Sequence, residues 1–333
     1  VDRHIPVLWL AHRARLLEQA CESLRSSTAF LRHRRDDLRV RVISGAGNHG
    51  HPTTAGPGDD VIFWGIQSAV RHIDRIEAWR SAAGEVLVVV DEAHHAVAAS
   101  YRKVLRSLHL IGHDNPDRAH LLGLTATPTR TNPAEIGQLE KLFGSTFYGN
   151  PSVARLITDR ILARPRIERL ETQIEIEGEL DETEQAALKR FGVYGERTLR
   201  RLYEQTGRDK VIVEHYVSHR RAEGEPIEAG PRKALVFAID TMNAMSLRRE
   251  FRDHGIWAEA IVQNNRGLTE DPTWNGEHIR TNDEVLDRFI RGDGPDILIT
   301  VILLTEGVDI PNLDTVYLAR PTNSRSLFNQ MVG

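Results

Sequence analysis

Two adjacent carboxylates are the side chains of this sequence best suited to do chemistry. Asp91 and Glu92 directly follow Val86–Val90, a fully apolar run that predicts a buried strand. Open α/β folds bind their ligands at the carboxyl ends of parallel strands, so we expect both carboxylates at such an edge. There Asp91 can hold a hydrated Mg²⁺ ion, while Glu92 can orient a water for attack on a phosphoryl group. A strand that simply ends in a polar turn is the alternative for a bare acidic pair.

Two hydroxyl side chains follow the next predicted strand. Leu121–Leu124 leads into Thr125, Ala126 and Thr127, and Pro128 stops the strand from extending further. The segment comes one βα unit after the carboxylates, and in a parallel sheet this spacing makes the two strand ends neighbours. Threonines that merely form a turn are the alternative.

Parallel sheets are needed to position these residues, and the sequence predicts two of them. Short β-branched runs alternate with amphipathic stretches, which is the pattern of βα units. The predicted strands are Val7–Leu10, Val40–Ile43, Val61–Phe63, Val86–Val90 and Leu121–Leu124, then Ala234–Phe237, Ala260–Val262, Ile297–Thr300 and Thr315–Leu318. We therefore expect an α/β fold with a first domain over residues 1–150, a linker and charged helical arm over 151–231, and a second domain over 232–333.

Helices and loops fill the intervals between these strands. The helix after the first strand has an apolar face that includes Cys21, and further helices are expected from Thr241 and from Thr281. The charged helical stretches of the arm are interpreted as solvated. The glycine- and proline-rich segment 45–60 predicts a surface loop, in which His49 and His51 are interpreted as solvated side chains.

The composition is that of a soluble globular protein. Of the 333 residues, 40% are hydrophobic and 27% are charged, which excludes a disordered chain and a collagen. No apolar run approaches the roughly 20 residues that cross a bilayer, so we expect no membrane association and a cytoplasmic location. A single cysteine excludes an internal disulfide. With 43 basic and 47 acidic residues the net charge is −4, so local groups must hold any nucleic acid partner.

At these residues the sequence resembles the superfamily 2 helicases. Asp91-Glu92-Ala93-His94 is similar to their second motif, and Thr125-Ala126-Thr127 is similar to their third. Further segments resemble the other motifs in the same order: Pro6–Gln19, Ile66–Ser68, Ala234–Asp240, Ile297–Pro311 and Ser324–Gly333. The residues within these motifs are more similar to those of the restriction-enzyme-like (ResIII) branch than to those of the DEAD-box branch. The ResIII-like branch translocates on double strands.

The resemblance implies two RecA-like domains in tandem that couple ATP hydrolysis to movement along nucleic acid. Asp91 would bind Mg²⁺, Glu92 would activate water, and His94 would link the ATP site to the other domain. The resemblance assigns ATP binding to Gly307, Asp309 and Gln330, and coupling to Thr125 and Thr127. It assigns nucleic acid contacts to His12, Arg13, Gln67, Thr300 and Val301. The implied cofactors are ATP and Mg²⁺, and the implied partners are double-stranded DNA, ahead of RNA, together with nuclease, methyltransferase or defence-complex subunits.

The sequence departs from the family pattern at two functional motifs. No G-K-[ST] signature of a phosphate-binding P-loop occurs in the 333 residues, and the last motif stops at Gly333, before its first arginine. We therefore expect this chain by itself to hydrolyse little ATP. The sequence is interpreted as a piece of a longer motor whose missing parts are disordered, deleted or on another chain.

Two other functions remain open at this point. One is a non-catalytic RecA-like module that binds nucleic acid or serves as a scaffold without an ATP site of its own. The other is a metal hydrolase, for which the acidic pair would join nearby histidines around zinc. Those histidines are His94, His95, His109, His113 and His120, although their spacing fits no closed zinc pattern.

Overall fold

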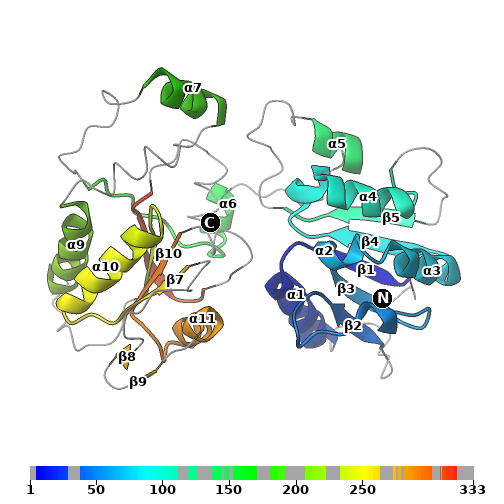
Figure 1. Ribbon diagram of the computed structural model, residues 1–333, viewed down its shortest axis with the longest axis horizontal. Coiled ribbons are helices and arrows are strands. Elements are labelled where there is room, and N and C mark those ends of the chain that lie inside the picture. The colour runs from blue at the N-terminus through cyan, green and yellow to red at the C-terminus, as the bar shows by residue number, and fades with distance from the viewer. Residues whose placement is uncertain are drawn as a thin grey trace. The chain divides into compact units, whose positions relative to one another are not determined.

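A computed structural model shows two compact units, Val1–Ser152 and Val153–Gly333 (Figure 1). The residues it describes are 5–28, 38–111, 119–125, 137–144, 146, 148–149, 153–170, 181–191, 207–222, 233–262, 273–274, 277–278, 281–301, 308 and 310–320. Side chains at 153, 187–191, 220–222, 273–274 and 277–278 lie outside this description. None of the described helices is long and apolar enough to cross a membrane.

The first unit is built around a five-stranded parallel sheet in the order β2-β3-β1-β4-β5. Its strands are β1 (Val7–Ala11), β2 (Val40–Ile43), β3 (Val61–Gly65), β4 (Val86–Val90) and β5 (Ala119–Gly123). Its helices are α1 (Ala14–Ser27), α2 (Ile66–Ala69), α3 (Ile73–Ala83), α4 (Ala99–Ser107) and α5 (Gln138–Phe143), with 3₁₀ turns η2 (Pro52–Thr54) and η3 (Ala93–Val97). The predicted strands are all present, with small shifts at their ends.

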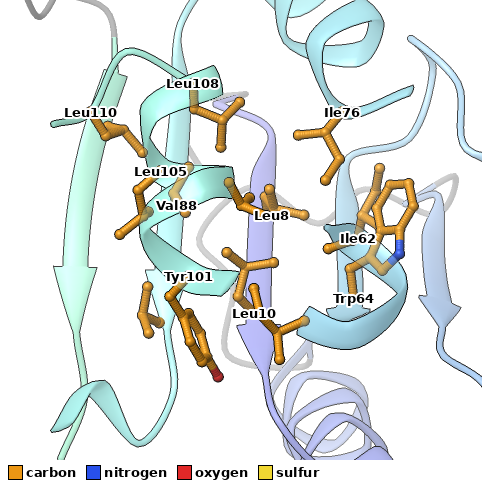
Figure 2. Packing of buried hydrophobic residues seen from close by; sticks show 14 of the residues in the cluster. Leu8, Leu10, Ile62, Trp64, Ile76, Val88, Tyr101, Leu105, Leu108 and Leu110 are labelled. Carbon is orange, nitrogen blue, oxygen red and sulfur yellow. The ribbon is translucent and has the colours of Figure 1, made fainter. Parts of the chain in front are cut away.

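Alternation along the strands gives this sheet two apolar faces. Leu8 and Leu10 of β1 point to the face covered by α3 and α4, where they pack with Ile76 and Tyr101 (Figure 2). The neighbouring Val7 belongs to the opposite core, which α1 covers with a face that includes Leu17 and Cys21. Cys21 is buried, as its place on the apolar face of the helix predicts.

The second unit holds a four-stranded parallel sheet in the order β11-β6-β10-β7. Its strands are β6 (Lys233–Phe237), β7 (Ala258–Ile261), β10 (Ile297–Thr300) and β11 (Leu313–Leu318). A separate antiparallel pair, which the sequence pattern does not predict, is formed by β8 (Thr273–Trp274) and β9 (Glu277–His278). The helices are α6 (Val153–Thr158), α7 (Glu182–Phe191), α9 (Arg208–Ala222), α10 (Thr241–Asp253) and α11 (Asn282–Arg291).

Side-chain caps fix where the helices beside this second sheet begin. Asp240 Oδ1 accepts the Asn243 N–H at 2.8 Å before α10, and Thr281 Oγ1 accepts the Glu284 N–H at 3.1 Å before α11. These are the starts that the sequence predicts, because Asp and Thr are good N-cap residues. Gly292 then ends α11 in the left-handed conformation.

One helix of the predicted arm is not simply solvated. In α9, Ile212, Val213 and Tyr216 are buried and pack in one core with α10 and one face of the second sheet. The opposite face of that sheet packs on α11 through a separate core that includes Phe289. The interpretation of α9 as a solvated charged helix is therefore wrong, since a short apolar stripe lies within its charged sequence. The α/β fold with two RecA-like parallel sheets in tandem is confirmed.

Candidate active site

The carboxyl edge of the first sheet gathers polar residues from all five strands. Because the strands are parallel, the segments that follow them emerge at the same edge. In the order of the sheet they carry Ser44 after β2, Gln67 after β3, His12 after β1, Asp91 after β4 and Thr125 after β5. Residues proposed to contact nucleic acid therefore lie on the β3–β1 side, and residues proposed to do chemistry lie on the β4–β5 side.

Asp91 is a partly desolvated carboxylate that follows β4 at this edge. Its Oδ1 accepts the Glu92 N–H at 2.9 Å, and its Oδ2 accepts a long hydrogen bond of 3.4 Å from Trp9 Nε1. Burial raises the pKa of Asp91, although these two donors oppose the rise. A cation would offset the cost of burying this charge. The carboxylate therefore fits a role as a Mg²⁺ ligand that leaves other positions to water and phosphate oxygens.

Glu92 holds a strained backbone conformation next to Asp91. Its φ and ψ angles, 47° and 55°, lie in the left-handed region, which a non-glycine residue rarely occupies. Its carbonyl accepts the His95 N–H at 2.8 Å, which starts the 3₁₀ turn η3. Backbone strain of this kind often marks functional sites. Here it turns the chain sharply, so that two successive carboxylates stand between β4 and η3.

His94 contacts one residue in each of the two segments that resemble the second and third helicase motifs. Its Nδ1 lies 3.3 Å from Glu92 Oε2 and 3.1 Å from Thr125 Oγ1, and its side chain is buried. The strand ends of β4 and β5 are therefore neighbours, as the parallel pairing predicts. One imidazole thus contacts both the carboxylate that is predicted to activate water and the threonine hydroxyl.

The 3₁₀ turn η3 is attached firmly to β5. Ala93 N–H donates to the Leu124 carbonyl at 2.7 Å, and Leu124 N–H donates to the Val90 carbonyl at 2.9 Å. Gly123 permits this approach, because a Cβ there would lie 2.8 Å from the Ala93 Cβ and from Phe143 of α5. The position of His94 is therefore set by close backbone packing.

The remaining candidates of the first unit lie on the β1 and β3 side of the edge. His12 and Arg13 connect β1 to α1, and Gln67 lies in α2 directly after β3. The His12 ring contacts the His95 ring, with the centroids 4.5 Å apart. The sheet edge thus brings His12, which is proposed to contact nucleic acid, next to η3, the turn that contains His94 and His95. From the sequence alone, His95 is a candidate only as a zinc ligand.

In the second unit the candidates are Thr300 and Val301, at the carboxyl end of β10. Thr300 is fully buried, and within the described part of the chain its Oγ1 has no hydrogen-bond partner. Val301 is half-buried and packs against the core shared with α9 and α10. Four further candidates, Thr127, Gly307, Asp309 and Gln330, lie outside the described residues.

The interpretation of His49 as a solvated side chain is wrong. Its side chain is only 6% exposed, because Nδ1 is bonded to Ser44 Oγ at 2.6 Å and Nε2 to Glu18 Oε1 at 2.8 Å. Ser44 Oγ also accepts the Ala46 N–H at 3.0 Å. This network ties the loop after β2 to helix α1, whereas His51 is exposed as predicted. Nothing in the local sequence indicates that Glu18 is the partner of His49.

The histidines weighed as zinc ligands are dispersed. His120 pairs with Glu85 at the opposite, amino end of β4 and β5, at 2.8 Å, and both side chains are exposed. His113 lies outside the described residues. Across the part of the chain that the structure covers, no group of three or more His, Cys, Asp or Glu side chains could hold a metal ion. The geometry therefore does not support the zinc hydrolase alternative.

Comparisons with known proteins match the family that the sequence resembles. The model of the ResIII family, described as the type III restriction enzyme res subunit, matches residues 2–130. A protein of Saccharomyces cerevisiae named as the ATP-dependent helicase IRC3 is 26% identical over 326 residues, covering 98% of this chain and 40% of that protein. A Schizosaccharomyces pombe protein named as a mitochondrial ATP-dependent helicase is 26% identical over 251 residues, covering 74% of this chain and 35% of that protein. The predicted cytoplasmic location remains a prediction.

Solved structures show the same fold. A fragment named as the HsdR subunit of a type I restriction enzyme from Vibrio vulnificus matches with a TM-score of 0.62 and 21% identity, over 99% of this chain and 49% of that one. The Hef helicase domain of Pyrococcus furiosus matches with a TM-score of 0.53 and 17% identity, over 98% of this chain and 83% of that one. The chain spans less than half the length of each of the two helicase-named relatives described above.

Proposed function

Since this chain belongs to the restriction-enzyme-like branch of the superfamily 2 helicases, we propose that it is part of an ATP-driven motor that translocates on double-stranded DNA. The observation that carries the proposal is the arrangement of Asp91, Glu92, His94 and Thr125 at one edge of the first sheet. A family resemblance alone would not require these side chains to converge. Their convergence would place the two carboxylates that take part in phosphoryl chemistry next to two side chains that can change position in response to it.

The first unit would contribute two carboxylates to ATP hydrolysis. Asp91 would hold Mg²⁺, whose charge helps to neutralise the phosphates of ATP. Glu92 would orient the attacking water and accept its proton, because its carboxylate is held beside His94 at 3.3 Å. His94 and Thr125 would then register the state of this carboxylate through the hydrogen bond of 3.1 Å between them.

Nucleic acid would lie over the other half of the same sheet edge. His12, Arg13 and Gln67 follow β1 and β3, where imidazole, guanidinium, amide and main-chain groups can contact phosphates without a large positive field over the whole chain. In the second unit, Thr300 and Val301 occupy the corresponding end of β10. We propose that double-stranded DNA is the substrate and that nuclease, methyltransferase or defence-complex subunits are the partners, because the relatives include a subunit of a restriction enzyme.

The test is ATP hydrolysis by the complete protein with no nucleic acid, with linear double-stranded DNA and with single-stranded RNA. We expect DNA to stimulate turnover, and Asp91→Asn to reduce the stimulated rate by about 100-fold or more. Asp74→Asn is the matched control, since Asp74 is exposed on α3 of the same unit, and it should stay within about twofold of wild type.

Movement along the duplex is measured by displacement of a triplex-forming strand. Displacement that requires ATP and an intact Asp91 is the expected result. Equal stimulation by RNA would overturn the choice of substrate. Binding of DNA without stimulated hydrolysis would instead support the non-catalytic RecA-like module.

A further inference from the structure

Three imidazole rings form a continuous contact between the two halves of the first sheet edge. The His12 ring lies 4.5 Å from the His95 ring, and the His95 ring lies 4.2 Å from the His94 ring, measured between centroids. Both pairs are tilted, with interplanar angles of 53° and 41°. His12 and His95 are far apart in the sequence, so the fold itself creates this contact.

The anchoring of η3 determines how a displacement of the His95 ring would act. Ala93 is fixed to β5 by its hydrogen bond to Leu124 at 2.7 Å, and the Ala98 N–H closes the far end of the turn on the His95 carbonyl at 3.0 Å. Between these points the rings of His94 and His95 contact each other, with their centroids 4.2 Å apart. A change at His95 is therefore passed to its neighbour His94 more readily than to the backbone.

His94 in turn contacts the groups assigned to chemistry and coupling. Its Nδ1 is within 3.3 Å of Glu92 Oε2 and 3.1 Å of Thr125 Oγ1. A small rotation of the imidazole would favour one of these contacts over the other. The orientation of Glu92 toward the attacking water would change with it.

We propose that His95 is a positioning residue that transmits the state of the loop at His12 to His94 and Glu92, so that bound nucleic acid accelerates ATP hydrolysis. The inference rests on the proposed function, because it names the contact through which the motor would sense its substrate. His95 would touch neither ATP nor nucleic acid. Its contribution would come from the ring contact with His12, which a planar ring at this position preserves and a smaller polar side chain removes.

The test compares His95→Asn with His95→Phe in the complete protein. His95→Asn should lower the ratio of DNA-stimulated to unstimulated ATP hydrolysis by about five- to tenfold, the range of a modest coupling between two sites. DNA affinity without nucleotide should stay within about twofold of wild type. His95→Phe, which keeps a planar ring, should recover at least half of the lost ratio. His120→Asn, at the opposite end of the same sheet, is the matched control and should leave the ratio unchanged.

A double-mutant cycle with His12→Asn separates a relay from two independent effects, which spatial proximity alone cannot do. If the signal passes through the ring contact, the double variant should show the same stimulation ratio as the more impaired single variant. Losses that multiply would overturn the proposal. A normal ratio in His95→Asn would overturn it as well, as would a parallel fall of both rates with a lower melting temperature, which indicates a structural role.

The wild-type protein distinguishes the two levels of inference. If DNA stimulates the wild type and His95→Asn behaves like it, the relay is wrong and the motor stands. If DNA does not stimulate the wild type at all, the proposed function fails, and the relay fails with it because there is no stimulation to transmit.

Discussion

In the first unit, the carboxyl edge of the sheet combines a desolvated carboxylate with a strained backbone, whereas in the second unit several polar groups at the equivalent edge connect helices and strands to one another. Burial raises the pKa of Asp91, and Glu92 occupies a left-handed backbone conformation. At the second edge Asp240 caps α10. Asn243 Oδ1 accepts the Ile239 N–H at 3.0 Å, while its Nδ2 donates to Asp209 at 2.8 Å.

Charged residues of the second unit also connect elements of its fold. Arg208, at the start of α9, donates to the carbonyl of Ala319, and Arg320 donates to the carbonyl of Ile239 at 3.4 Å. Burial lowers the pKa of both guanidinium groups and raises the pKa of Asp209. These residues connect α9, β6 and β11 to one another. Two sheets of the same design can thus carry different functions, because the fold supplies the edge and the residues at the edge supply the chemistry.

The largest expected effect is a loss of ATP turnover without a loss of nucleotide affinity, caused by a change at the first edge. Glu92→Gln in the complete protein should lower ATP turnover by about 100-fold or more and leave nucleotide affinity within about twofold, since an amide keeps the shape but cannot take the proton of water. Nucleotide binding and steady-state hydrolysis are the two measurements. Glu85→Gln, an exposed change at the other end of β4, is the control. Equal loss of affinity and rate would show that Glu92 mainly supports the structure.

A stability change tests the role assigned to the second edge. Asn243 is buried, and Asn243→Ala leaves the Ile239 N–H and the Asp209 carboxylate without this partner. We expect the free energy of unfolding of the second unit to fall by about 2 kcal/mol. Hydrogen exchange resolves this loss by unit, and the first unit should keep its protection.

The neighbouring residue supplies the control for that experiment. Met242 is 60% exposed on the same helix, so Met242→Ala should change the protection of the second unit very little. If Asn243→Ala were as mild as Met242→Ala, the polar groups of the second edge would not be secured by this network, and the contrast between the two edges would fail.

The contrast also explains which features the sequence could predict. Strands such as Val86–Val90 were predictable because an unbroken apolar run has few other outcomes, and helix starts such as Thr281 were predictable because capping is local. The bond from His49 to Glu18 and the ring contact of His12 with His95 join segments distant in the sequence. Such contacts depend on strand order, which hydrophobic periodicity does not encode.

A smaller effect concerns the hydroxyl that reaches His94. Thr125→Val removes the hydrogen bond of 3.1 Å between Oγ1 and His94 Nδ1 but retains a β-branched side chain. We expect DNA-stimulated ATP hydrolysis to stay within about an order of magnitude of wild type, while the ATP consumed per base pair travelled rises severalfold. Combining it with Thr127→Val should enlarge the rise, as the resemblance assigns coupling to both threonines. An unchanged consumption ratio would eliminate the coupling role of Thr125.

The smallest expected effect concerns two carboxylates, one from each unit. Their ionisation is expected to change the stability of their units in opposite directions. The hydrogen bond from His215, at 3.1 Å, lowers the pKa of Glu168, whereas burial raises that of Asp91. A lowered pKa means that the ionised Glu168 stabilises its unit at neutral pH, and this contribution is lost as pH falls from the ordinary value near 4.5 through the lowered one. A raised pKa means that the ionised Asp91 costs stability at neutral pH, and this cost disappears as pH falls from the raised value to the ordinary one near 3.8.

The two amide variants should therefore act in opposite directions. At pH 7, Glu168→Gln should lower hydrogen-exchange protection in the second unit, and Asp91→Asn should leave protection in the first unit unchanged or higher. Both differences from wild type should shrink below about pH 4, where the wild-type carboxylates become protonated. A loss of protection in Asp91→Asn at pH 7 would mean that the Trp9 and Glu92 hydrogen bonds outweigh burial, and that Asp91 stabilises its unit much as Glu168 does. Greater protection would show that the first unit gives up stability to keep a desolvated charge at the edge, which is the expected cost of holding a carboxylate ready for a cation.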